Sequence, residues 1–219
     1  MDKCTLIRKA IPIWICVFSS IASAGGLRFQ SERYGYQLSV PSGWTQIPDD
    51  VLKESVDSMP AEARRLVRET GFQYKYSKEW FIYPFVIIQV VPQERTRINR
   101  MVTEKEFLDF VKQLPGLSGN RQLKNTLEAI GDQPEREWAL NSLAALSKST
   151  VKYDLPKRKY WLTVTSNEPS VGKVTTLIGG TFLANGVAVQ VNAYSRTDQM
   201  DKFALTILEL HESVSNARP

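Results

Sequence analysis

The stretch EWFIYPFVIIQVVP, from Glu79 to Pro92, decides the fold of this chain. It is almost entirely apolar, is rich in β-branched and aromatic residues, and lacks the spacing of an amphipathic helix. Both alternating sets of side chains are apolar, which is typical of a strand covered on both faces. Pro84 removes one backbone donor and indicates a bulge or an edge at that point. We therefore predict a strand at the centre of a sheet with layers on both sides.

The residues before this stretch predict strands and helices in alternation. Tyr34 to Val40 alternates as a half-buried strand does, and Pro41-Ser42-Gly43 follows as a turn. Asp49 or Asp50 can cap the helix that comes next. Pro60 fits a fresh first helical turn, which we expect to end with Gly71 as a left-handed C-cap.

A hairpin leads from this region into the central strand. Phe72, Tyr74 and Tyr76 alternate with polar residues, and Ser77-Lys78 offers a turn back. Beyond the central strand, Thr103 and Glu106 form a capping box before a helix with apolar residues at helical spacing. Pro115-Gly116 ends that helix.

The middle of the chain is ambiguous and its end is clear. Residues 117–148 give mixed signals: Leu123 to Ile130 suggests a short helix, and Trp138 to Leu146 fits a helix or a strand. The region 151–164 predicts a hairpin, 174–182 a strand, and Asn185-Gly186 a type I′ hairpin turn with two positive φ angles. A final amphipathic helix begins near Asp198.

Together these elements predict an α+β protein: a three-layer α/β/α sandwich with a mostly antiparallel central sheet. Hairpins dominate, and helices early, midway and last can cover both faces. Neither an internal repeat nor a low-complexity linker divides the chain, so we expect a single domain over residues 25–219.

The first 24 residues have the pattern of a secretory signal peptide. A basic start precedes a short apolar run, and Ala22-Ser23-Ala24 is a small-x-small motif that predicts cleavage between Ala24 and Gly25. The alternative is an uncleaved N-terminal membrane anchor. Both cysteines, Cys4 and Cys16, lie here, so the mature chain would contain neither a disulfide nor a thiol nucleophile. These features favour a periplasmic or secreted bacterial protein.

Charge and motifs argue against several function classes. Losing Lys3, Arg8, Lys9 and Asp2 with the signal peptide lowers the net charge from +5 to +3, and the remaining cations are mostly dispersed, so we expect no nucleic-acid partner. Phosphate-loop, dinucleotide-binding and nucleophile-elbow motifs are absent from the sequence, and we predict no cofactor. With one histidine, a histidine-based metal site is not expected either.

The order of elements resembles a known family. An opening strand that runs into Pro41-Ser42-Gly43-Trp44, together with a late hairpin at Asn185-Gly186 and a terminal amphipathic helix, is similar to PsbP-like domains, a group that includes DcrB-like periplasmic proteins. The resemblance covers roughly residues 34–214 in element order. It implies a three-layer sandwich that serves as a binding or accessory module, without catalytic residues to carry over.

Catalytic candidates are few. His211 lies late in the last predicted helix, where it could complement the helix dipole. Acidic pairs such as Asp49-Asp50 and Glu135/Glu137 fit solvated carboxylates or caps better than a glycosidase-like pair. We therefore do not expect an enzyme, while a hydrolase with a carboxylate pair on the sheet rim stays an alternative.

Aromatic residues are the most prominent feature of the sequence after the signal segment. The four tryptophans after the signal segment fit core packing, or an exposed patch for a partner. The candidate binding residues are Lys157, Arg158, Lys159 and Trp161, in a hairpin with a basic and aromatic tip that could touch an anionic partner. The resulting hypothesis is an exported, non-enzymatic binding or accessory protein whose partner is another envelope protein or a small ligand. Membrane contact is expected only if the N-terminal segment is retained.

Overall fold

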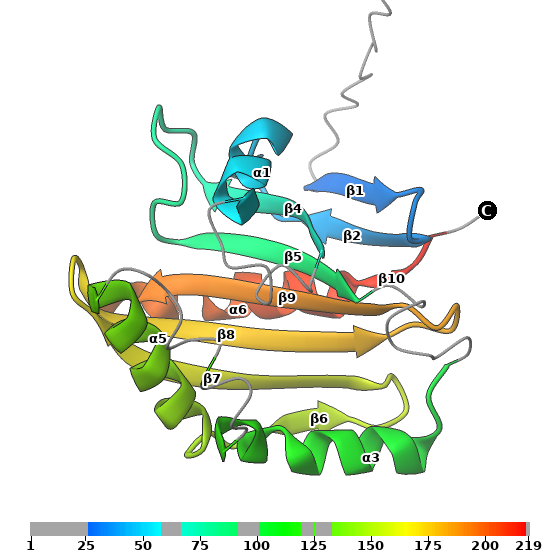
Figure 1. The fold of residues 1–219 in the computed structure, drawn as a ribbon. Helices are drawn as coiled ribbons and strands as arrows, with labels where there is room; N and C mark the ends of the chain where they lie inside the picture. The colour runs from blue at the N-terminus through cyan, green and yellow to red at the C-terminus, as the bar shows by residue number, and fades with distance from the viewer. Residues whose placement is uncertain (1–25, 58–66, 92–100, 120–124, 126–132, 218–219) are drawn as a thin grey trace, which may run out of the picture.

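The computed structural model describes residues 26–57, 67–91, 101–119, 125 and 133–217. Its strands form a seven-stranded sheet in the order β3-β4-β5-β9-β8-β7-β6 and a three-stranded sheet in the order β1-β2-β10 (Figure 1). The elements are β1 (Leu27–Ser31), β2 (Tyr36–Val40), β3 (Trp44–Gln46), α1 (Asp49–Asp57), β4 (Val67–Tyr74), β5 (Phe85–Val91), α3 (Glu104–Gln113), the 3-10 helix η2 (Pro115–Gly119), α5 (Gln133–Leu146), β6 (Lys152–Asp154), β7 (Lys159–Glu168), β8 (Gly172–Phe182), β9 (Ala188–Arg196), α6 (Thr197–Ser213) and β10 (Ser215–Asn216).

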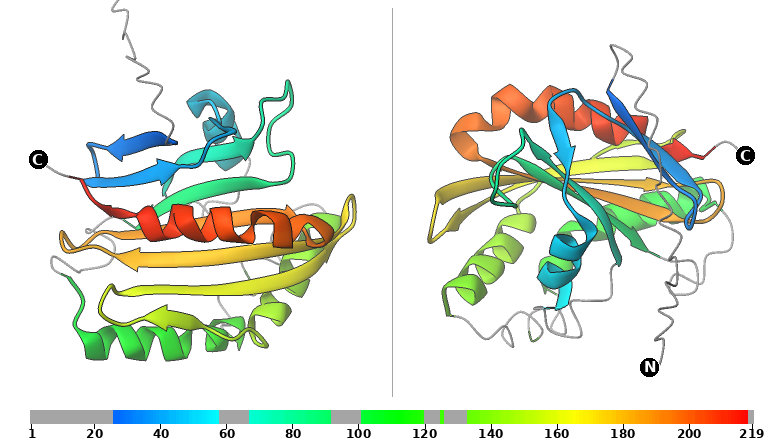
Figure 2. Two further views of the ribbon diagram at one scale, coloured as in Figure 1. Left: turned by 180° about the vertical axis from the view of Figure 1, so that it is seen from behind. Right: turned by 90° about the horizontal axis from the view of Figure 1, so that it is seen from above.

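The predicted fold class is confirmed. Each pair of neighbouring strands in the described residues is antiparallel. Helix α6 and the small sheet cover one face of the large sheet, and α1, α3 and α5 lie on the other (Figure 2). The result is a layered α+β sandwich.

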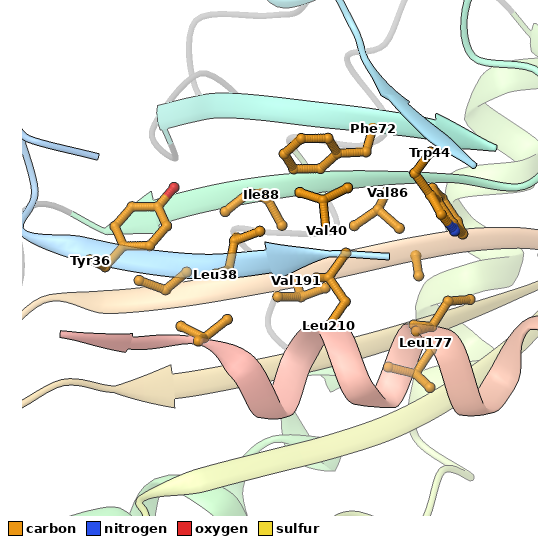
Figure 3. Close-up of a cluster of buried hydrophobic side chains, with 14 of the residues drawn as sticks. Tyr36, Leu38, Val40, Trp44, Phe72, Val86, Ile88, Leu177, Val191 and Leu210 are labelled. Atoms are coloured by element: carbon orange, nitrogen blue, oxygen red, sulfur yellow. The ribbon is translucent and has the colours of Figure 1, made fainter. Parts of the chain in front are cut away.

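The core on the α6 side joins the two sheets to the last helix. Alternate residues of β2, which are Tyr36, Leu38 and Val40, face Phe72 of β4 and the inward residues of β5 (Figure 3). Ile207 and Leu210 of α6 are 1 % exposed and close this core. Residues three apart share one face of a helix, so both side chains lie in an apolar stripe against the sheet.

The core on the opposite face has two parts. Near α1, Leu52 packs with Ile47 and Ile87. Near α3, Phe107 and Val111 pack on inward residues of β7. The predicted capping box of α3 is confirmed, because the Thr103 hydroxyl accepts from the Glu106 backbone N–H while the Glu106 carboxylate accepts from the Thr103 N–H.

The central strand is shorter than predicted. Strand β5 begins at Phe85, and residues 79–84 form a loop that ends in a cis Tyr83–Pro84 peptide bond. Strand β9, rather than β5, is the middle strand of the seven. Residues 80–83 therefore belong to a loop whose aromatic side chains pack beside the sheet. Their apolar character is the reason why the sequence predicts one continuous strand here.

The expected C-cap at Gly71 is wrong. Gly71 lies inside β4, which pairs with β3 on one side and β5 on the other. A Cβ atom at this position would lie 3.0 Å from the side-chain Cδ1 atoms of both Ile47 and Ile87. Close packing, rather than a left-handed turn, explains this glycine. The start of the predicted second helix, at Pro60, lies outside the described residues.

The ambiguous middle region contains a helix, α5, over Gln133–Leu146, so Trp138 to Leu146 is helical. The short helix expected at Leu123 to Ile130 lies outside the described residues. The late hairpin is present, but its turn differs from type I′ because only Gly186 has a positive φ angle. The Gly186 N–H donates to Leu183 O, and the Asn185 amide nitrogen donates to Tyr34 O. Asn185 thus joins this turn to the β1–β2 connection.

Candidate functional site

An aromatic loop, residues 75–84, connects β4 to β5. Tyr76 and Ile82 in this loop are 73 % and 42 % exposed, and both are among the most exposed large apolar side chains described. The Tyr76 and Trp80 rings meet edge to face with centroids 6.1 Å apart. Single exposed apolar residues are common, but a cluster of them marks an interaction site more often.

The loop is continuous with an aromatic row on the sheet. The Phe81 and Tyr83 rings lie 5.6 Å and 5.4 Å from the Phe85 ring. Phe85 stacks on Tyr194 of β9, with centroids 4.8 Å apart and an interplanar angle of 22°. This row anchors one side of the loop to the sheet, while Tyr76 and Ile82 stay at the surface.

A buried glutamine fixes the backbone of the loop. Gln73 is 1 % exposed, its amide nitrogen donates to Glu79 O, and its amide oxygen accepts from Ile82 N. Phe81 lies between those two contacts with φ of 62°, a left-handed conformation that is unfavourable for an aromatic residue. The two glutamine bonds therefore hold a conformation that the local sequence disfavours.

Electrostatics at the loop are mixed. Lys75 Nζ lies 5.5 Å from the centroid of the Tyr74 ring, within the range of a cation–π contact. Lys78 and Glu79 are exposed. The Tyr83 hydroxyl donates to the Glu168 carboxylate, and burial together with that carboxylate raises the pKa of Tyr83. Tyr83 is therefore a neutral donor at neutral pH.

The predicted basic turn has intramolecular partners throughout. Lys157 pairs with Asp154 and Glu212 at 3.2 Å and 3.3 Å. Arg158, at φ of 53°, donates through Nε to Val102 O and through Nη1 to Leu155 O. Trp161 packs against the core on the α6 side. A role for these residues in binding stays a prediction.

Lys159 has the most distinctive position in that turn. It is 4 % exposed, and its Nζ donates to the backbone oxygens of His211 and Glu212 at the end of α6. The ammonium thus gives a donor to Glu212 O and a second donor to His211 O, which also accepts from Val214 N at the helix end. Burial lowers the pKa of Lys159, and Glu212 partly offsets that shift.

His211 does not complement the helix dipole with charge, contrary to our expectation. It is fully buried, and burial with the nearby Lys159 lowers its pKa to about 4, so the imidazole is neutral at neutral pH. Its Nε2 lies 3.4 Å from Thr181 Oγ1. A Cβ on Gly179 would lie 2.6 Å from the imidazole, so the glycine makes room for the ring.

Two chemical alternatives can be compared with the described residues. Among the described residues, the carboxyl group of Glu69 has a raised pKa, caused first by burial. Its neighbours are the hydroxyls of Ser31 and Tyr36 rather than a second carboxylate. No group of three or more metal-ligating His, Cys, Asp or Glu side chains occurs in the same residues. Glu69 is thus not paired with a second carboxylate, as the hydrolase alternative would require.

Sequence reasoning placed Trp80 in a strand and missed the loop. The available signal was Pro84 together with Ser77-Lys78-Glu79, because a polar run before an aromatic stretch and a proline can mark an extended connection. The expected signal-peptide cleavage site at Ala24 lies outside the described residues. Within the described part of the chain, no helix combines the length and hydrophobicity needed to cross a bilayer.

Comparison with known proteins gives limited similarity. Neither a protein-family model nor a curated protein sequence matches the chain. Solved structures with a similar fold include PsbP (CyanoP) from Synechocystis sp. PCC 6803, with 10 % identity, a TM-score of 0.44, and coverage of 90 % of this chain and 95 % of that one. LpqN, involved in cell envelope biogenesis in Mycobacterium tuberculosis, has 10 % identity, a TM-score of 0.44, and coverage of 90 % and 88 %. The Ran-binding protein Mog1p of Saccharomyces cerevisiae has 11 % identity, a TM-score of 0.38, and coverage of 88 % and 95 %.

A cyanobacterial PsbP is thus among the structures that this chain resembles, as the sequence resemblance predicts. The resemblance to DcrB-like proteins stays a prediction.

Proposed function

We propose that this protein is an exported, non-enzymatic binding or accessory protein, and that the aromatic loop is its contact with another envelope protein. The observation that carries the proposal is the combination of exposed Tyr76 and Ile82 with a backbone fixed by the buried Gln73. Export rests on the signal-peptide pattern of residues 1–24.

Energetics favour a protein partner for this loop. Apolar surface removed from water on binding contributes about 25 cal/mol per Å². Tyrosine and tryptophan are enriched among the residues that dominate the affinity of protein interfaces. A loop whose backbone is already fixed loses less conformational entropy when it binds. The partner should offer an apolar pocket for Tyr76 and Ile82, with acidic groups opposite Lys75 and Lys78.

The test is cross-linking of the exported protein in its own envelope, followed by affinity capture and mass spectrometry. The wild type is compared with the double variant Tyr76→Ala/Ile82→Ala. A matched control is Leu205→Ala, because Leu205 is 75 % exposed and belongs to another element, helix α6. We expect one stoichiometric partner for the wild type and the control, and a roughly tenfold or greater loss for the double variant.

Two outcomes would contradict the proposal. Equal capture by all three proteins would place the contact elsewhere, and recovery of the protein alone would remove the accessory role. Loop-dependent binding to vesicles of anionic phospholipid, without a protein partner, would favour a membrane surface instead. Mass spectrometry of the mature N-terminus tests export separately, with a chain that begins at Gly25 as the expected result.

A further inference from the structure

A strip of long polar side chains crosses the middle of the large sheet. It consists of Arg68 of β4, Gln89 of β5, and Gln190 and Asn192 of β9. Arg68 is the register partner of Gln89, and Gln89 is the register partner of Gln190. Directly paired residues of antiparallel strands lie on the same face, so the strip is contiguous. It occupies the face that carries α1, α3 and α5.

Apolar side chains lie on both sides of Asn192. Ile87 pairs with Asn192 and belongs to the cluster under α1. Ile178 pairs with Asn192 from β8 and packs against the cluster under α3. Asn192 is therefore set between two parts of the core, where its amide group loses solvation and needs partners.

The amide groups of the strip form a directed chain of hydrogen bonds. Gln190 Nε2 donates to Asn192 Oδ1 at 2.8 Å, and Asn192 Nδ2 donates to Gln89 Oε1 at 2.8 Å. The oxygen of Gln89 is therefore occupied, while its NH₂ group keeps its donors beside Arg68. The chain of bonds ends with donors at the Arg68 end of the strip.

Arg68 adds further donors at the same place. Its Nη1 donates to Ser55 Oγ at 3.1 Å, and within the described residues it forms no ion pair with a carboxylate. A guanidinium presents five N–H donors in a planar fork, so most of its donors remain available. Burial lowers the pKa of Arg68, which indicates that the charge is partly desolvated. A desolvated charge without a counterion is unfavourable unless an anion can reach it.

We propose that Arg68 and Gln89 form a binding site for the anionic group of a small ligand, either a carboxylate or a phosphate. The guanidinium fork binds two oxygens of such a group, and the Gln89 amide donates a third hydrogen bond. Partly buried Ile178 lies beside Asn192, at the other end of the same strip. The site involves residues other than those of the aromatic loop.

The test is a titration of the full mature protein with sodium phosphate and, separately, sodium acetate, at constant ionic strength with chloride. Nuclear magnetic resonance of the arginine Nε–Hε groups reports binding at each guanidinium. Arg68→Met identifies the Arg68 signal. Arg196→Met is the matched control, because Arg196 is exposed and pairs with Asp198 at 3.2 Å.

We expect a saturable shift of the Arg68 signal with at least one of the two anions, unchanged in the Arg196→Met protein. The anion that saturates at the lower concentration identifies the chemical class of the ligand. A linear, unsaturated shift that is the same at Arg68 and Arg196 with both anions would overturn the proposal, because it reports only bulk screening.

A second variant, Gln89→Glu, keeps the proposal testable if Arg68→Met fails to fold. It puts a carboxylate of the same shape directly beside Arg68, so an internal ion pair occupies the guanidinium. We expect affinity for the anion to fall at least tenfold while the melting temperature stays equal or rises. Undiminished anion binding by the Gln89→Glu protein would show that Arg68 and Gln89 do not form the site.

Discussion

Two sets of cationic side chains in this molecule have opposite surroundings. In the basic turn, Lys157 bonds to carboxylates and Lys159 to backbone oxygens of α6. On the sheet, Arg68 is half-buried and bonds to the Ser55 hydroxyl, without a carboxylate partner among the described residues. The turn is conspicuous in the sequence as three consecutive cations, whereas Arg68 is inconspicuous. The difference teaches that three consecutive cations need not be available to a binding partner. The contacts that each cation makes within the protein decide whether it is available.

The largest effect should come from acid, through the histidine beside Lys159. The pKa of His211 is about 4 in the fold and about 6.5 in the unfolded chain, so the unfolded state takes up a proton first. Stability is therefore full above pH 6.5 and falls as the pH drops from about 6.5 to about 4, by about 3 kcal/mol in total. Urea unfolding of the wild type across this pH range measures the slope.

His211→Leu is the comparison protein for that slope, because it removes the titrating group and keeps an apolar side chain beside Gly179. Glu69, whose pKa is raised, contributes a slope of opposite sign in both proteins and cancels in the difference. Equal slopes for the two proteins would contradict this prediction, because they would show that the pKa of His211 is the same in the fold as in the unfolded chain.

Removing the buried ammonium should have the next largest effect. Lys159→Met keeps the length of the side chain but removes the donor to Glu212 O, while His211 O keeps only its bond from Val214 N. An unsatisfied buried acceptor costs roughly 1–3 kcal/mol, so we expect the free energy of unfolding to fall by about 2 kcal/mol. Urea unfolding at pH 7 measures this loss.

Lys157→Met is the matched control in the same turn. Its ammonium is exposed, and exposed ion pairs contribute little to stability. Its midpoint of unfolding should equal that of the wild type. A loss for Lys157→Met as large as that for Lys159→Met would mean that the turn acts through its surface charge rather than through the buried cap.

Local sequence signals predicted elements whose partners lie nearby in the chain. The capping box at Thr103 and Glu106 needs only four consecutive residues, and it forms as predicted. The late hairpin and α6 also follow from short-range patterns. The type of turn at Asn185-Gly186 could not be predicted, because the Asn185 amide is engaged by the distant backbone of Tyr34.

Tertiary pairing decided the elements that local patterns missed. In the sequence alone, Gly71 is typical of a helix C-cap. In the fold, its strand pairs with a neighbouring strand on each side. The polar strip was predictable in part, because Gln89, Gln190 and Asn192 interrupt apolar strands at alternate positions. Their meeting with Arg68 depends on the order of strands in the sheet, which one sequence does not specify.

The smallest effect, and the sharpest form of the comparison, is expected for Arg68→Met. This change removes the hydrogen bond to Ser55 but also removes a partly desolvated charge without a carboxylate partner, and the two effects oppose each other. We expect the free energy of unfolding to change by less than about 0.5 kcal/mol, as measured beside Lys159→Met under the same conditions. A loss near 2 kcal/mol would give Arg68 the same structural role as Lys159. A small change together with loss of anion binding separates the two cations: one holds a helix end in place, and the other is kept free for a ligand.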